Sequence, residues 1–117
     1  MDDYARSLLP LTPAALHILL ALSAEQRHGY GIMQEIARQS EGQYKPGPAT
    51  LYDNLQKLLD TGLVAEVQRK TAEADERRRY YRLSALGRRV LSAEIRRLEG
   101  VVRAAKTSLG KTATGRA

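Results

Sequence analysis

Residues 45–64 read Lys45-Pro46-Gly47-Pro48-Ala49-Thr50-Leu51-Tyr52-Asp53-Asn54-Leu55-Gln56-Lys57-Leu58-Leu59-Asp60-Thr61-Gly62-Leu63-Val64, with a helix start and a helix stop at the two ends. Gly47 can serve as the N-cap and Pro48 as the first helical residue, where a missing N–H costs nothing. Gly62 follows the last turn, where a left-handed residue closes a helix. The leucines recur at helical spacing and form one apolar stripe of Leu51, Leu55, Leu58 and Leu59. We therefore predict one helix that begins at Pro48 and ends before Gly62.

The opposite side of this helix carries small and polar residues, namely Ala49, Thr50, Asp53, Gln56, Lys57 and Asp60. One face therefore suits a protein core, and the other face is free to touch a partner. The hypothesis that follows is that the polar face enters the major groove of DNA.

The composition is that of a small chain with one domain. Its 117 residues suffice for a modest hydrophobic core. The chain has no Cys, which excludes disulfides, thiolate metal sites and a Cys nucleophile. The longest apolar run, Ala14 to Leu22, is far shorter than the ~20 residues of a membrane span. Because Met1-Asp2-Asp3 is also unlike a secretory signal, we expect a cytoplasmic protein.

Charge is distributed unevenly along the chain. Residues 1–76 hold 7 Lys/Arg against 11 Asp/Glu, a net of −4, and residues 77–117 hold 12 against 2, a net of +10. A basic half suggests a polyanionic partner such as nucleic acid or an anionic membrane surface. Charge alone does not separate this interpretation from a solvated, charge-rich helix.

Further helices and a hairpin flank the central helix. Apolar spacing predicts helices at about 13–23 and 30–40. After Gly62 the period changes from 3.6 to 2, which predicts strands at 63–69 and 77–83. These two strands, joined by a polar connection, form a hairpin.

The last helix is predicted to start after a Ser84 cap and to extend to Thr107 or Leu109. Its apolar residues are spaced 4, 3, 4, 3, 4, as in a heptad seam, and are Leu91, Ile95, Leu98, Val102, Ala105 and Leu109. The simplest partner for this seam is the same helix of a second copy, so we predict that it mediates dimerisation. The alternative is that the helix folds back on its own domain.

The predicted order is helix, helix, helix, hairpin, long helix. The short connection between the second and third helices resembles a helix-turn-helix, in which the hairpin would form the wing. We therefore expect a mainly α (α+β) fold, a winged helix-turn-helix with a C-terminal dimerisation helix. Its parts are a DNA-binding domain at 1–84, a dimerisation helix at 85–109 and a flexible tail at 110–117.

Three motifs carry a resemblance to a known family. They are His28-Gly29-Tyr30-Gly31-Ile32, then Pro46-Gly47-Pro48-Ala49-Thr50-Leu51-Tyr52 with Leu55, Leu58, Gly62 and Leu63, then Arg79-Tyr80-Tyr81-Arg82-Leu83-Ser84-Ala85-Leu86-Gly87. In this order and spacing, across residues 12–90, they resemble the PadR-like transcriptional regulators, and the single helix after the hairpin resembles the smaller members. The resemblance implies a homodimer that binds operator DNA, usually as a repressor. In some members a small molecule, such as a phenolic compound, releases the DNA.

Candidate DNA contacts come from this helix-turn-helix and its wing. Thr50 and Lys57 are the best candidates for groove or phosphate contacts. Asp53 either reads a cytosine amino group or pairs with Lys57 one turn away, and we favour the pairing. Tyr30 and Tyr52 either reach phosphates or serve only in packing. The basic residues that flank the wing tip are Arg69, Lys70, Arg77, Arg78 and Arg79. They either contact the DNA backbone or minor groove, or they form a solvated edge of the wing. The full predicted set is Tyr30, Lys45, Thr50, Tyr52, Asn54, Lys57, Arg69, Arg77 and Arg78.

The wing tip carries Glu73, Asp75 and Glu76, which a phosphate would repel. We expect this acidic tip to point away from DNA or to pair with the basic flanks.

Other function classes find little support in the sequence. No nucleophile–base pair, metal cluster or phosphate-binding loop is recognisable, so we expect no enzyme, no cofactor and no metal. Glu94 and Glu99 are placed on a charged helix face. The expected partners are double-stranded DNA, a second copy and a small-molecule effector of unknown identity, with no membrane. The alternative is a winged-helix module that binds another protein and has lost operator binding, which Asp53, Asp60 and the acidic wing tip motivate.

Overall fold

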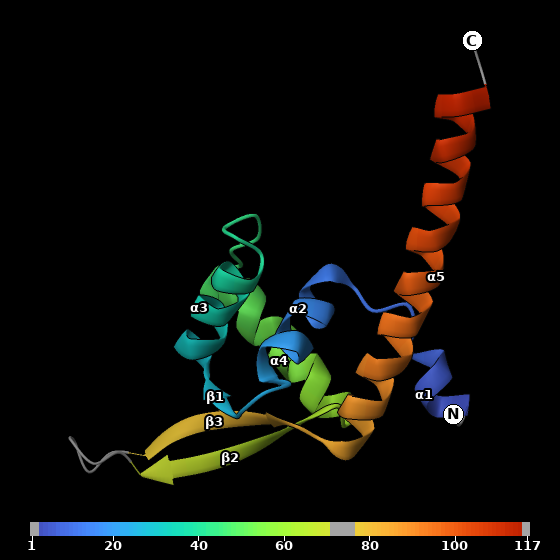
Figure 1. The fold of residues 1–117 in the computed structure, drawn as a ribbon. Helices are drawn as coiled ribbons and strands as arrows, with labels where there is room; N and C mark the ends of the chain where they lie inside the picture. Colours follow the sequence, from blue (N-terminus) through green and yellow to red (C-terminus); the bar gives the residue numbers. More distant parts are fainter. Residues whose placement is uncertain (1–2, 71–76, 116–117) are drawn as a thin grey trace.

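The computed structural model describes the backbone of residues 3–70 and 77–115 and the side chains of residues 3–67 and 79–110. The fold is mainly helical with one small antiparallel sheet, as expected (Figure 1). The elements are α1 (Asp3–Ser7), α2 (Pro13–Leu22), β1 (Arg27–His28), α3 (Gly29–Gln39), α4 (Pro48–Thr61), β2 (Val64–Lys70), β3 (Arg77–Leu83) and α5 (Ala85–Gly115).

The core lies where α2 meets α3, α4 and the start of α5. Because α2 is apolar nearly all round, it can be covered on several sides and becomes the central helix. Each large side chain removed from water there contributes about 1.5–3 kcal/mol. The most deeply buried large apolar side chains of these helices are Ile18, Leu19, Leu22, Ile32, Ile36, Leu51, Leu55 and Val90.

Helix α4 has the predicted ends. Gly47 is the N-cap of α4, and Pro48 is its first residue. At the other end Gly62 has a φ of 84°, the left-handed conformation that glycine adopts without a steric penalty. The Leu63 N–H then donates to the Leu58 carbonyl oxygen at 3.0 Å, which closes the helix and directs Leu63 into the core.

The sheet has three strands in the order β1-β3-β2, one more than the predicted hairpin. In β1, Arg27 pairs with Tyr81 and His28 pairs with Tyr80. Strand β1 was not predicted, because a two-residue strand has no periodicity of its own. The five-residue helix α1 was not predicted either.

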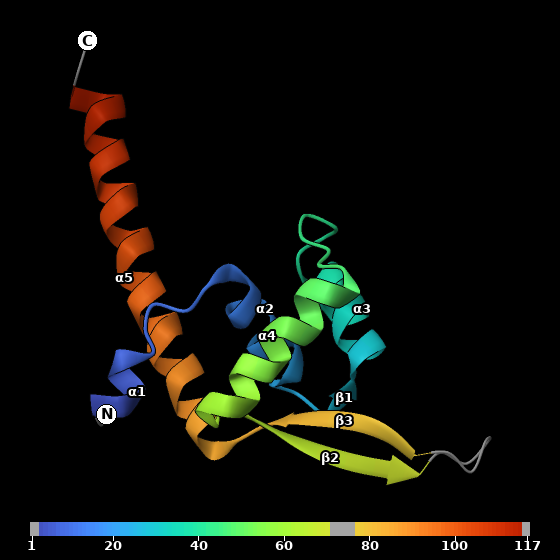
Figure 2. The same ribbon diagram turned by 180° about the vertical axis from the view of Figure 1, so that it is seen from behind.

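Helix α5 has 31 residues and continues to Gly115, beyond the Leu109 end that we expected. A single glycine such as Gly110 costs only about 1 kcal/mol in a helix and does not end it. The Ser84 hydroxyl accepts a hydrogen bond from the Gly87 N–H at 2.9 Å, so the predicted cap is confirmed. The first half of α5 packs on the domain, and the second half projects away from it (Figures 1 and 2).

Glu94 is buried rather than placed on a charged surface, which corrects the sequence interpretation. Its side chain is 1% exposed, and Oε2 accepts the Leu11 N–H at 2.9 Å. Arg97 donates to both carboxylate oxygens, at 2.6 and 2.9 Å. The hydrogen bonds from Arg97, and to a smaller extent the one from Leu11, keep the pKa of Glu94 below its usual value although the carboxyl group is buried. The carboxylate therefore fastens the N-terminal segment to α5.

Candidate nucleic-acid interface

Helix α4 crosses one side of the domain, in front of α2 in Figure 2. Its leucine stripe is turned into the core, which forces the opposite residues outward. Thr50, Asp53 and Lys57 are exposed, and Asn54 is half-buried at the edge of this face. The predicted division of the helix into a core face and a free face is confirmed.

Neighbouring side chains on α4 satisfy its charges. Lys57 Nζ lies 3.6 Å from Asp53 Oδ2, so the favoured pairing is present. The Gln56 amide donates to Asp60 Oδ1 at 2.9 Å, and the Asn54 amide donates to the Thr50 carbonyl oxygen at 2.8 Å. Exposed pairs of this kind contribute only about 0.2–0.5 kcal/mol, so a phosphate can replace Asp53 as the partner of Lys57.

Tyr52 leans from α4 onto the start of α3. The residue is 47% exposed. A Cβ atom at Gly29 would lie 2.0 Å from the Tyr52 hydroxyl oxygen, so the missing side chain of Gly29 leaves the space for the phenol. Tyr30, the next residue of α3, is 63% exposed. Two phenol groups thus lie at the N-terminal end of α3, the end at which the helix dipole favours a phosphate.

His28 holds the start of α3 in place, a role that the sequence analysis missed. It is the N-cap, and its Nδ1 accepts the Gly31 N–H at 2.9 Å. Its ring also stacks on Tyr80 of β3, with ring centroids 5.3 Å apart. A polar residue directly before Gly29 was the available sequence signal. The His28 side chain therefore joins α3 to the sheet.

The wing is the hairpin of β2 and β3. Its register places Arg69 opposite Arg78 and Lys70 opposite Arg77. The side chains of the predicted contacts Arg69, Arg77 and Arg78 lie outside the described residues, as does the acidic tip at 71–76.

Nearer the domain, the strands of the wing carry an exposed ion pair. Arg79 donates to both carboxylate oxygens of Glu66, at 2.9 and 3.0 Å. These bonds lower the pKa of Glu66 and raise that of Arg79. Burial raises the pKa of Tyr81, whose ring packs inward beside this pair. The charge of Arg79 is therefore already matched within the chain.

The remaining predicted DNA contact, Lys45, is exposed in the loop between α3 and α4. It lies just before the first turn of α4, at the same end as Thr50.

The predicted dimerisation residues divide into two groups. Leu91 is buried in the domain core, and Ile95 packs partly against it. Leu98 is half-buried, and Val102, Ala105 and Leu109 are exposed. Only the later part of the apolar seam is thus free for a partner.

The described residues hold no group of three His, Cys, Asp or Glu side chains that could bind a metal ion. His17 packs against Tyr44, with ring centroids 4.9 Å apart. None of the helices in the described ranges is long and apolar enough to cross a membrane.

Comparison with known proteins identifies the family. The model of the transcriptional regulator PadR-like family matches residues 18–93. The transcriptional regulator Rv3488 of Mycobacterium tuberculosis is 37% identical over 89 residues, which cover 75% of this chain and 78% of that protein. The chain belongs to the PadR-like family.

Solved structures of PadR-like proteins share the fold. A PadR family regulator from Clostridium difficile R20291 superimposes with a TM-score of 0.73 at 17% identity, over 84% of this chain and 99% of the other. Bacillus subtilis PadR in complex with operator DNA superimposes with a TM-score of 0.64 at 20% identity, over 74% of this chain and 48% of the other. The fold of this PadR-like chain is therefore the winged helix that the sequence analysis expected, and its family is one of regulators rather than enzymes.

Proposed function

We propose that this PadR-like chain is a cytoplasmic repressor that binds a pseudo-palindromic operator as a homodimer. The observation that carries the proposal is the uncovered polar face of α4, on which Thr50, Lys57 and Tyr52 are exposed. Helix α4 lies in front of α2 in Figure 2. A helix held in this way has the form that reads a major groove.

The proposed contacts divide by chemistry. Thr50 and Asn54 would face base edges or sugars, and Lys57 would exchange Asp53 for a phosphate. Tyr30 and Tyr52 would donate to phosphates near the start of α3. Lys45 and the wing residues Arg69, Arg77 and Arg78 would supply sequence-independent attraction.

DNA selection with the purified protein, followed by titration of the selected duplex, tests operator recognition. We expect selective binding that weakens steeply with salt. The variant Thr50→Ala/Lys57→Ala should lose at least tenfold in affinity for the selected duplex. Its loss for random DNA should be smaller, because only the Lys57 phosphate contact is independent of sequence. Lys106→Ala, which removes a lysine charge from exposed α5, is the control. Equal binding of selected and random DNA, or a silent double variant, would contradict the proposal.

The homodimer is proposed to form through the free part of α5. Leu98, Val102 and Leu109 share one side of the helix, and the last two are 50% and 67% exposed. Apolar surface of this kind is removed from water when it packs against an identical helix.

Release by a small-molecule effector completes the proposal. The chain has six Tyr and no Trp or Phe, so a flat effector would have to stack on tyrosine. Screening of phenolic compounds for dissociation of the protein–DNA complex tests this step.

The second candidate function is a winged-helix module that binds a protein instead of an operator. The exposed Asp53 and Asp60 on α4 favour it, because both would repel phosphate. Their pairing with Lys57 and Gln56 weakens this argument. Retention of a defined protein partner without DNA retention at low salt would decide for it.

A further inference from the structure

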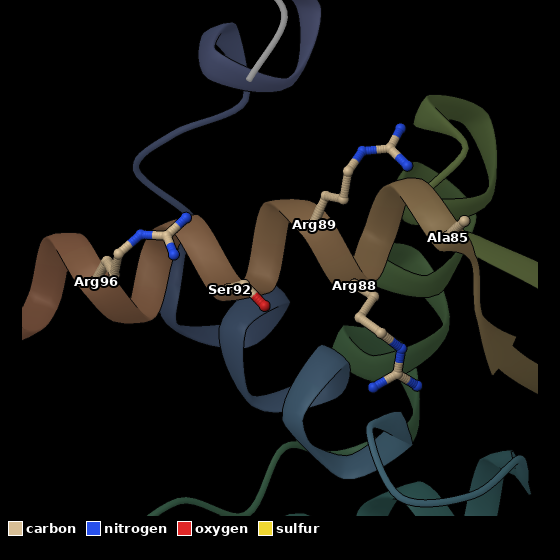
Figure 3. Close-up of a pocket in the computed structure, with 5 residues that line it drawn as sticks. All are labelled: Ala85, Arg88, Arg89, Ser92 and Arg96. Carbon is tan, nitrogen blue, oxygen red and sulfur yellow. The ribbon is translucent and has the colours of Figure 1, made fainter.

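The outward side of α5 carries a cationic surface that the operator contacts do not use. It consists of Arg88, Arg89, Ser92 and Arg96, which with Ala85 line an open hollow (Figure 3). We call these four residues the α5 ridge. All of them are exposed, and within the described side chains none of the three arginines forms an ion pair.

The arrangement of the ridge suits a linear anion. Arg88 extends to one side of α5 and Arg89 and Arg96 to the other, with Ser92 between them (Figure 3). The small side chains of Ala85 and Ser92 line the hollow together with the arginines. A phosphodiester strand lying there would have guanidinium groups on both flanks, and the planar guanidinium matches phosphate geometry.

The length of the ridge also fits a nucleic acid backbone. Arg88 and Arg96 are eight residues apart, which is about 12 Å along a helix. Successive phosphates of one DNA strand advance about 3.4 Å along the duplex axis, so the ridge spans three to four of them. Beyond it, Glu99 interrupts the positive charge before Arg103 restores it.

The ridge and the polar face of α4 lie on different sides of the molecule. In Figure 1, α2 lies in front of α4, whereas α4 lies in front in the reverse view of Figure 2. The ridge adjoins α2, because Arg88 donates to the carbonyl oxygen of Ser23, the C-cap of α2, at 3.3 Å. One straight duplex on α4 therefore does not reach the ridge of the same protomer.

Other partners fit the ridge less well. A protein interface has an apolar or aromatic centre, and the ridge offers only Ala85 and the arginine stems. A membrane-surface helix places apolar side chains opposite its cations, whereas here the opposite side of α5 is buried in the domain.

We propose that the α5 ridge binds the phosphate backbone of a second segment of double-stranded DNA, separate from the segment read by α4. The occupied regulator would then hold two DNA segments together. The interaction is independent of base sequence, since every proposed contact is to phosphate.

A capture assay tests this proposal. The full-length protein is bound to a duplex on beads, and a second, labelled duplex of random sequence is added. We expect Arg89→Gln/Arg96→Gln to capture at least tenfold less of the second duplex than the wild type. Its binding to a single 20-base-pair duplex that carries the selected operator should stay within about threefold of the wild type. Arg88 is left intact because of its hydrogen bond to Ser23.

Two control variants isolate the ridge. Arg89→Lys/Arg96→Lys keeps the charge at the same positions and should retain most of the capture. Arg38→Gln removes an exposed arginine charge on α3 and should behave as the wild type. Thermal unfolding of all variants checks that each is folded.

The assay distinguishes a second DNA segment from the flank of the duplex that α4 already binds. If the ridge holds the flank of the same bent duplex, the glutamine variant will lose affinity for a long operator duplex, and the wild type will capture no second duplex. That result would support a DNA contact at the ridge but would contradict the proposal that a separate DNA segment binds there. The assay also works with random-sequence beads, so a failure of operator recognition leaves it interpretable.

Three results would overturn the proposal altogether. One is unchanged capture by the glutamine variant, and another is an equal loss in Arg38→Gln. The third is ridge-dependent binding to vesicles containing phosphatidylserine without any ridge-dependent DNA capture, which would assign the ridge to lipid headgroups.

Discussion

At the start of α3, the missing side chain of Gly29 leaves the space that the Tyr52 hydroxyl occupies. Gly29 of α3 thus sets the position of the Tyr52 hydroxyl, which belongs to α4 and is proposed to donate to a phosphate. Nothing else about Gly29 demands glycine, because alanine is favoured over glycine in helices by up to about 1 kcal/mol.

Gly29→Ala should therefore change function more than stability. The new methyl group displaces the end of the Tyr52 side chain, which can swing outward, so the free energy of unfolding should change by no more than about 1 kcal/mol. DNA affinity should fall to the level of Tyr52→Ala, measured by fluorescence anisotropy on the selected operator duplex.

The double variant Gly29→Ala/Tyr52→Ala provides the control. Because both changes act on one phenol, the double variant should bind no more weakly than either single variant. Additive losses would show that Gly29 acts by another route.

At the scale of elements, the joint between the wing and α5 depends on a close approach of two backbones. A Cβ atom at Gly87 would lie 2.1 Å from the Leu63 carbonyl oxygen. At Gly100, on the same helix, the nearest atom to such a Cβ is the end of the Arg103 side chain at 3.9 Å. The two glycines therefore have opposite roles in one helix.

Alanine at these two positions should shift stability in opposite directions. Gly87→Ala should destabilise by about 1–3 kcal/mol, because a main-chain oxygen cannot yield as a flexible side chain can. Gly100→Ala should stabilise by up to about 1 kcal/mol through helix propensity. Urea unfolding followed by circular dichroism measures both, and stabilisation by both substitutions would refute the close contact.

Features that arise within a single element could be predicted from the sequence. The ends of α4 and the Asp53–Lys57 pair were predictable, because Pro48, Gly62 and one-turn spacing act within a few residues. The exposed face of α4 followed from its leucine spacing.

Contacts between distant segments were not predictable in this way. Strand β1 exists only because Arg27 and His28 pair with β3, more than fifty residues later. Glu94 is buried because the Leu11 N–H reaches it from a segment 83 residues away. Within the candidate site, the stacking of His28 on Tyr80 and the contact between Gly29 and Tyr52 depend on the same kind of long-range packing.

At the scale of the whole molecule, α5 dominates the shape. Its 31 residues correspond to a rod of about 46 Å, and the molecule extends 67 Å along its longest axis. The projecting half carries the apolar residues assigned to dimerisation.

Val102→Glu should weaken the proposed dimer at least tenfold without unfolding the domain. Val102 is 50% exposed in the single chain, so a carboxylate there costs little until a second helix covers it. Sedimentation velocity over a micromolar concentration series gives the dissociation constant.

Thr107→Glu adds the same charge at another exposed position of α5 and should leave association unchanged. A wild-type monomer throughout the series, or equal effects of both substitutions, would argue against pairing through the seam.

The proposed dimer would also make the activity of the regulator depend on its own concentration. The largely exposed residues 98–110 have little tertiary packing to support their helix, so they would gain order mainly from the proposed pairing. Folding of this segment and association would then be a single equilibrium, which dilution reverses. At low copy number the operator would empty before the protein is degraded, and the number of molecules per cell would itself act as a signal.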